Sequence, residues 1–273
     1  MTQLCDTFYG RAHWTWDILS KARAINSQIG EETITDLHCL EFKLRHPNQV
    51  YTKTFSKREE GENGADWEWW FTDKRKWLGF RVQAKVVDFE TDNFRNLHYK
   101  NQGQYQVDRL LHRSLTGPYK KIPIYCLYMQ WSSNKKLPEQ YSGQIFNRVD
   151  FGCSIMSAFS VRYMREIKLK SDLESLLHHL QPWVGLVCPF HDLKMNLPQQ
   201  VWWSWMTLVV MRESILKDGL EGRSLPPELV ELNKQCSNIQ PTQDPPPYVQ
   251  QVLNGGSIEQ PDADLRTITI FSE

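Results

Sequence analysis

Apolar residues recur at helical spacing in the first 45 residues of the chain. Residues 6–24 are expected to form an N-terminal helix, and the stretch GEETITDLHCLEFKL, residues 30–44, is expected to form a second one. The residues of this second stretch that recur at helical spacing are Ile34, Leu37, His38, Leu40 and Leu44. Acids occupy its first turn, where they interact favourably with the helix dipole.

Alternation of apolar and polar residues then replaces the helical pattern. The segment QVYTKTF, residues 49–55, alternates as a strand does, and residues 65–72 and 78–88 form two further strand candidates joined by the basic turn DKRKW. Helical spacing returns at residues 104–115, and KIPIYCLYMQW, residues 121–131, is typical of a buried strand.

The order helix, strand, strand, strand, helix, strand predicts an α/β fold with a mixed sheet flanked by helices. We expect an N-terminal helical segment (residues 1–27), a core (28–135) and a C-terminal, mainly helical elaboration packed on the core (136–273). The elements expected in the elaboration are helices near Ser154–Val161, Asp172–Leu180 and Gln199–Lys217, a strand at Trp183–Val187 and an extended proline-rich connection at residues 239–251.

The composition is compatible with one large domain, and this domain carries no strong net charge. The chain has 273 residues, 40% of them hydrophobic, and a formal net charge of zero, so any nucleic-acid surface must be a local basic patch. Six cysteines are scattered without paired spacing, which favours reduced thiols in a cytoplasmic protein. No signal peptide or membrane-spanning stretch is expected, so we predict no membrane partner.

Polar side chains interrupt two of the strand candidates. In ADWEWWF, Asp66 and Glu68 share one face of a strand while tryptophans occupy the other, and Gln83 and Lys85 point together from FRVQAKVV. If the two strands pair as a hairpin, these four side chains can converge on one open face. Carboxylate and amide oxygens are ligands for Mg²⁺ or Mn²⁺, and a nearby lysine can orient a metal-bound water, so the pattern indicates metal-assisted phosphodiester hydrolysis.

Asp66, sixteen intervening residues and then Gln83-Ala84-Lys85 resemble the PD-(D/E)xK nuclease superfamily, in the Q-x-K variant of Mrr-type restriction endonucleases. The resemblance covers roughly residues 28–130 and implies a restriction-endonuclease-like core. It also implies an acid from the preceding helix, for which we choose Glu32 over Glu31, and a polar side chain from the following helix, for which YQVDR offers Gln106 and Arg109. Gln83 replaces the usual acid of the motif, and Glu68 could compensate for it.

The resemblance implies a metal-dependent endonuclease, acting on DNA, with Asp66, Glu32, Glu68 and Gln83 as metal ligands and Lys85 as the residue that positions the attacking water. The whole chain is also similar to a bacterial domain family with an E-T-x-T, GADWEWW, QAK and Y-Q-x-D-x-L series, often found among anti-phage genes. This similarity implies a role in antiviral defence. The sequence shows no recognisable DNA-reading element, so we expect a homo-oligomer or a defence partner protein to choose the target.

Other interpretations stay open at this point. The acids could be solvent-facing residues of a half-exposed strand, Lys85 could extend from a strand edge, and Glu32 could serve the helix dipole alone. Cys188 and His191 have a C-x-x-H spacing, but a zinc site needs about four ligands and no second pair lies nearby. The main alternative function is a catalytically inactive nuclease-fold module that binds nucleic acid or a partner protein.

Overall fold

The central feature of the molecule is a mixed sheet, which contains seven strands among the described residues, in the order β1-β9-β2-β3-β6-β7-β8. The computed structural model describes residues 3–55, 67–101, 103–131, 146–177, 179–188, 195–207, 227–256, 258 and 265–273. The strands are β1 (Val50–Thr54), β2 (Trp67–Thr72), β3 (Trp77–Val86), β6 (Ile122–Tyr128), β7 (Cys153–Ser157), β8 (Gln181–Pro182) and β9 (Thr267–Ser272), with a separate small hairpin of β4 (Lys100–Asn101) and β5 (Gln104–Tyr105).

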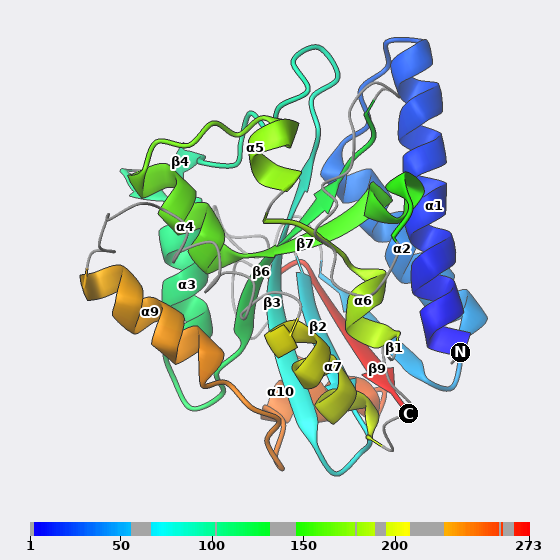
Figure 1. The fold of residues 1–273 in the computed structure, drawn as a ribbon. Coiled ribbons are helices and arrows are strands. Elements are labelled where there is room, and N and C mark those ends of the chain that lie inside the picture. Colours follow the sequence, from blue (N-terminus) through cyan, green and yellow to red (C-terminus); the bar gives the residue numbers. More distant parts are fainter. Residues whose placement is uncertain are drawn as a thin grey trace.

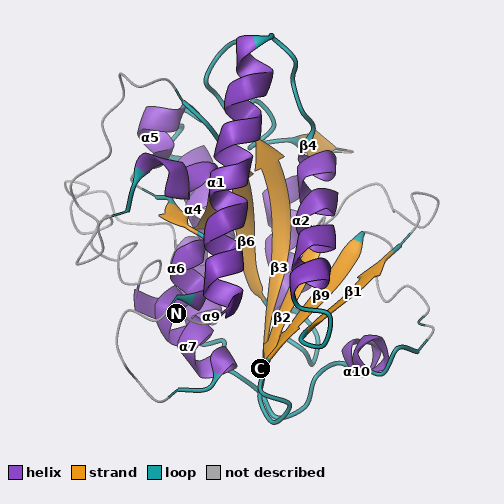
Figure 2. Cartoon of the chain, turned by 90° about the vertical axis from the view of Figure 1, so that its right-hand side faces the viewer, coloured by secondary structure: helices purple, strands orange, loops and turns teal. Residues whose placement is uncertain are grey.

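Helices cover both faces of this sheet (Figure 1). They are α1 (Gln3–Ala24), α2 (Glu31–Arg45), α3 (Gln106–Leu115), α4 (Ala158–Glu166), α5 (Leu173–Leu177), α6 (Val184–Val187), α7 (Leu197–Trp205), α9 (Pro227–Ser237) and α10 (Pro247–Leu253), with a 3-10 turn η1 at Arg148–Gly152. Figure 2 shows α1 and α2 side by side in front of the strands, and Figure 1 shows α3 and α4 on the other side of the sheet. The architecture is therefore α/β with a mixed sheet between helices, as the sequence predicted.

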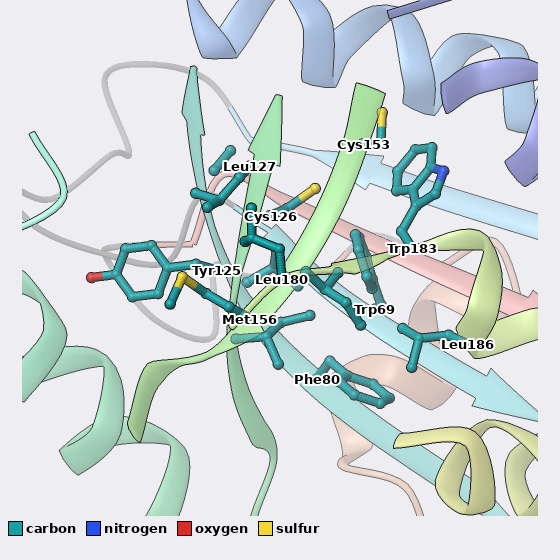
Figure 3. Packing of buried hydrophobic residues seen from close by; sticks show 14 of the residues in the cluster. Trp69, Phe80, Tyr125, Cys126, Leu127, Cys153, Met156, Leu180, Trp183 and Leu186 are labelled. Atoms are coloured by element: carbon teal, nitrogen blue, oxygen red, sulfur yellow. The ribbon is translucent and has the colours of Figure 1, made fainter. Parts of the chain in front are cut away.

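Strand alternation sorts the aromatic residues onto two faces. Trp67, Trp69 and Phe71 of β2 belong to the large core, whereas Trp70 belongs to a second core with Val249 of α10. Figure 3 shows the large core from close by, with Trp69 and Trp183 on the same side of the sheet and Tyr125 pointing away from them. Because both faces of β2 are buried, the face that carries Glu68 is not the open face expected from the sequence.

Several elements of the second half differ from the prediction. Val184–Val187 form the short helix α6 rather than a strand, and residues 153–157 form strand β7 before helix α4 begins at Ala158. Both errors have one cause, since short buried apolar runs have no polar face by which a strand and a helix can be distinguished. The helix expected at 199–217 is α7 up to Trp205, and its residues from 208 onward lie outside the described part of the chain.

The last strand crosses the expected domain boundary at residue 135. β9 lies between β1 and β2, antiparallel to β1 and parallel to β2, and β7 and β8 extend the sheet at its other end. The C-terminal segment therefore supplies strands to the sheet of the expected core instead of only packing against it. The proline-rich segment is also more ordered than an extended connection, because it pairs with Trp77 at Thr242 and then forms α10.

The cysteine prediction is wrong for two of the six residues. Cys5 of α1 and Cys188, after α6, form a disulfide across 183 residues of sequence. Two cysteines so far apart in the sequence form no local spacing pattern from which the disulfide could be predicted. The other four cysteines, Cys39, Cys126, Cys153 and Cys236, are buried thiols. Among the described residues, no helix has the length and the apolar character needed to cross a bilayer.

Candidate functional site

Gln83 and Lys85 lie on one face of the central strand β3. They follow Arg81 at every second position, and all three are buried, with Lys85 at 7% exposed. β3 pairs with β2 up to Val82 and with β6 along Phe80–Val86, so Gln83 and Lys85 lie next to β6 in the sheet and point to one of its helix-covered faces. An amide and an ammonium in the middle of a sheet are costly to bury without partners, which makes this stripe the chemically distinctive part of the strand.

Among the described residues, Glu31 in the first turn of α2 is the acid that pairs with Lys85. Its Oε1 atom lies 3.8 Å from Lys85 Nζ. Gln28 holds the preceding loop against the end of β3, since its side-chain amide donates to the carbonyl of Val87 at 3.1 Å and accepts from the amide of Phe89 at 3.2 Å. The start of α2 is thereby placed beside Lys85.

A cavity of about 300 Å³ opens beside this pair. Its walls are Gln28, Ile29, Gly30, Glu31, Lys85, Val86, Asp88, Phe94, Arg95 and Asn96. Asp88 accepts hydrogen bonds from the Thr91 amide and hydroxyl and forms an ion pair with Arg95 at 2.9 Å. Burial raises the pKa of Asp88, but these partners outweigh that effect and hold the pKa below its usual value. The cavity thus joins two carboxylates and two cations.

Glu32, the acid chosen from the sequence, points elsewhere. Its Oε2 atom forms an ion pair with Arg266 at 2.9 Å, and Arg266 also binds Asp36 at 2.6 Å. Glu32 and Asp36 share a helix face because they are four residues apart, whereas Glu31 is rotated by about 100° from Glu32. The structure therefore brings Glu31, not Glu32, to Lys85.

Glu68 belongs to a different cluster. It lies opposite Arg81 in the β2–β3 ladder, and its carboxylate forms an ion pair with Lys121 at 3.1 Å. Trp70 Nε1 and the Tyr248 hydroxyl both donate to its Oε2 atom, at 3.1 and 2.8 Å. Lys85 is four residues beyond Arg81, or about 13 Å further along the strand. Glu68 is therefore a buried ion-pair partner and does not converge with Lys85 as expected.

The two candidates from α3 have structural contacts. Arg109 donates from Nη2 to the carbonyl of Asn101 at 3.1 Å, which ties the β4–β5 hairpin to the helix. Gln106 begins α3 and is half-buried, with its backbone amide donating to the carbonyl of Tyr99 at 2.9 Å. None of these contacts involves Lys85.

Asp66 lies outside the described residues, as does His191. Within the described part of the chain, no group of three or more His, Cys, Asp or Glu side chains could hold a metal ion. Mg²⁺ is commonly held by one or two carboxylates together with waters and substrate phosphate. Among the described residues, Glu31 offers one carboxylate and Gln83 of β3 offers an amide oxygen. They therefore supply the smaller of the two carboxylate counts that such a site uses.

The sequence missed Arg81, Lys121 and Tyr248, which surround Glu68. Arg81 could have been found, because it precedes Gln83 by two residues and shares its strand face. Lys121 and Tyr248 are 53 and 180 residues from Glu68, and no local pattern connects them. The sequence shows the acidic pair Glu31 and Glu32, but only the docked helix decides which of the two acids faces Lys85.

Comparison with known proteins identifies a family and no activity. No match was found among curated proteins or among solved structures. A family match extends over residues 4–273, which is nearly the whole chain. The chain therefore belongs to the Family of unknown function (DUF6615).

Proposed function

We propose that this protein is a metal-dependent nuclease that hydrolyses phosphodiester bonds, with DNA as its substrate. One observation carries the proposal: the buried ammonium of Lys85 lies beside Glu31 and follows Gln83 on one strand face, at the wall of a cavity of about 300 Å³. The order of α2, β1, β2, β3, α3 and β6 agrees with the core that the QAK motif implies.

Each of these side chains has a defined task in the proposed reaction. A bound Mg²⁺ or Mn²⁺ would lower the pKa of a coordinated water and neutralise phosphate charge. Among the described residues, Glu31 and Gln83 would be its ligands. Lys85 would donate a hydrogen bond to the attacking water and offset the charge that develops on phosphorus-bound oxygens. Arg95, at the same cavity, is half exposed and can contact the neighbouring phosphate.

The test is plasmid cleavage in Mg²⁺ or Mn²⁺ by wild-type protein and by Lys85→Met, Glu31→Gln and Asp66→Asn. We expect nicking that EDTA abolishes and that each substitution lowers at least about a hundredfold. Glu32→Gln is the matched control, since it removes the same charge one residue away, and it should keep wild-type activity. Cleavage by Lys85→Met at the wild-type rate, or no cleavage of DNA or RNA with either metal, would overturn the proposal.

The second candidate is a nuclease-fold module without catalysis that binds nucleic acid or a partner protein. The neutral overall charge of the chain and the replacement of the second acid of the motif by Gln83 favour it. Calorimetric titration with Mn²⁺ separates the two, because a catalytic site takes up the ion with a Glu31-dependent signal and an inactive module does not.

The physiological setting is proposed on the resemblance alone. We propose that the protein acts in the bacterial cytoplasm against phage DNA, directed by an oligomer or a partner. Expression of the wild-type protein should then lower phage plaque counts, while expression of Lys85→Met at the same level should not. Equal plaque counts for both proteins would contradict the defence role but would not bear on the proposed nuclease chemistry.

A further inference from the structure

A second cavity, of about 260 Å³, lies at the opposite end of β3. It is lined by Lys76, Met195, Gln199, Trp202, Trp203, Gln240 and Pro241. Lys76 directly precedes β3, and Lys85 follows nine residues later, about 30 Å away along an extended strand. The cavity is therefore separate from the candidate nuclease site.

The walls of this cavity are held in place by hydrogen bonds outside it. Trp77 and Thr242 exchange backbone hydrogen bonds of 2.8 and 2.9 Å, which fasten the Gln240–Pro241 segment to the start of β3. Trp202 Nε1 donates to the carbonyl of Ile239 at 2.8 Å, so that indole is a fixed wall. The Asn196 side chain caps α7 by accepting from the amide of Gln199. The cavity is consequently formed before any ligand arrives.

Three kinds of chemical group meet there. Trp203 is 46% exposed, and its ring centroid lies 6.5 Å from that of Trp202 at an angle of 51°, so the two indoles do not stack on each other. The side-chain amides of Gln199 and Gln240 make no hydrogen bond with any described residue and offer both donors and acceptors. Lys76 forms no ion pair within the described chain.

The neighbouring turn adds further positive charge. Lys74 and Arg75 are exposed, while Asp73 accepts from the backbone amides of Arg75 and Lys76 and so shapes the turn. Three cations against one carboxylate leave the turn from Asp73 to Lys76 with a net charge of +2. An anionic group is thus favoured beside an aromatic face.

We propose that this cavity binds a nucleobase together with its phosphate. An indole provides a stacking surface for a base, amide side chains can hydrogen-bond its edge, and lysine and arginine bind phosphate. A neutral sugar would leave the cations unused, and an acidic peptide would leave the aromatic wall unused. The ligand is a free nucleotide or the end of a single strand, which share this chemistry. The inference goes beyond the proposed nuclease function and does not depend on it.

Calorimetry of the full chain in EDTA tests this proposal without metal or cleavage. The probes are AMP, a ten-nucleotide single strand and the same strand without bases. We expect Trp203→Ala to weaken binding of the first or the second probe by about ten- to a hundredfold, the size of one stacking contact. Lys76→Gln should weaken binding and reduce its dependence on salt.

Tyr119→Ala is the matched control, because Tyr119 is also an exposed aromatic residue beside lysines but lines none of the cavities described above. It should bind every probe as the wild type does. Binding of AMP alone identifies a free nucleotide, and binding of the strand alone identifies a strand end. Equal affinity for the strand without bases, equal affinity of Trp203→Ala, or binding of no probe overturns the proposal.

Discussion

His38 is a fully buried histidine in a network between α1, α2 and β7. Arg11 Nε donates to its Nδ1 atom at 2.9 Å, so the ring proton belongs on Nε2, which faces the Thr15 hydroxyl at 3.2 Å and the Cys153 thiol at 3.4 Å. Thr15 in turn donates to the Arg11 carbonyl. Burial, and then the charge of Arg11, hold the pKa of His38 well below its usual value. The neutral ring is therefore the form that the fold requires.

This network predicts a loss of stability on mild acidification. Below about pH 6.5 the unfolded chain protonates His38 while the folded chain does not, so the free energy of unfolding falls as pH falls. One such histidine contributes up to about 1.4 kcal/mol per pH unit. Denaturant unfolding of wild type and His38→Gln between pH 7.5 and 5.0 measures it, and the variant should show the shallower dependence.

His46 and His98 also have lowered pKa values, chiefly through burial, so the variant keeps part of the slope. The slopes are compared rather than the absolute stabilities, because the substitution also changes the folded core. Parallel curves for the two proteins would show that His38 is not held neutral.

The second prediction at this scale concerns Glu68. Glu68→Gln removes the charge that offsets Lys121 and leaves buried cations in excess, so we expect a loss of about 3 kcal/mol in the free energy of unfolding. Glu32→Gln, which breaks a half-exposed pair with Arg266, should cost less than about 1 kcal/mol. Denaturant midpoints at neutral pH measure both. Equal small losses would mean that Glu68 is not a structural ion-pair partner and would reopen its role as a metal ligand.

At the scale of elements, α1 packs directly against the turn η1 at Gly152. A Cβ atom on Gly152 would collide with the carbonyl oxygen of Ala12 and would lie 2.8 Å from the Trp16 amide, both of them backbone atoms of α1. Backbone cannot move aside as a flexible side chain can. We therefore expect Gly152→Ala to lower the free energy of unfolding by about 3 kcal/mol or more.

Gly10→Ala provides the matched comparison within α1. A Cβ atom there meets no atom within 4 Å, and alanine is the better helix former by about 1 kcal/mol, so this variant should be as stable as wild type or more so. Urea midpoints of the two variants measure the difference. A Gly152→Ala protein as stable as Gly10→Ala would contradict the close contact between α1 and η1.

Element prediction succeeded where side-chain periodicity is long and one-sided. α1, α2, α3, β1, β2, β3 and β6 were expected within a few residues of their observed bounds. α6 and β7 were missed, because both are short and buried on all sides and their apolar runs carry no period. The placement of β9 between β1 and β2 depends on pairing across 200 or more residues of sequence.

At the scale of the whole molecule, the Cys5–Cys188 disulfide joins the first helix to the segment after α6. It closes a loop of more than 180 residues, so it restricts the unfolded chain and should contribute about 2–4 kcal/mol. We expect dithiothreitol to lower the thermal midpoint of the wild type and to leave that of Cys5→Ser/Cys188→Ser unchanged.

Thiol titration of the denatured protein gives a direct count. Protein purified without reductant should show four reactive thiols, and reduction should raise the count to six, the number of cysteines in the chain. Six thiols before reduction would restore the expectation drawn from the cysteine spacing.

Which side chains share a strand face follows from the order of residues alone. Gln83 and Lys85 point together, and Trp67 and Trp69 point the other way from Trp70, because side-chain direction in a strand is a local property of the backbone. The same local rules determined the order of elements and the α/β class of the fold.

Which acids and cations meet depends on how the elements pack in the folded molecule. Glu31 reaches Lys85 because Gln28 docks the preceding loop on the end of β3, and Glu68 is neutralised by Lys121 rather than directed at Lys85. These contacts join residues from separate elements. Their distances depend on how helices and strands pack, which no periodicity along the chain encodes.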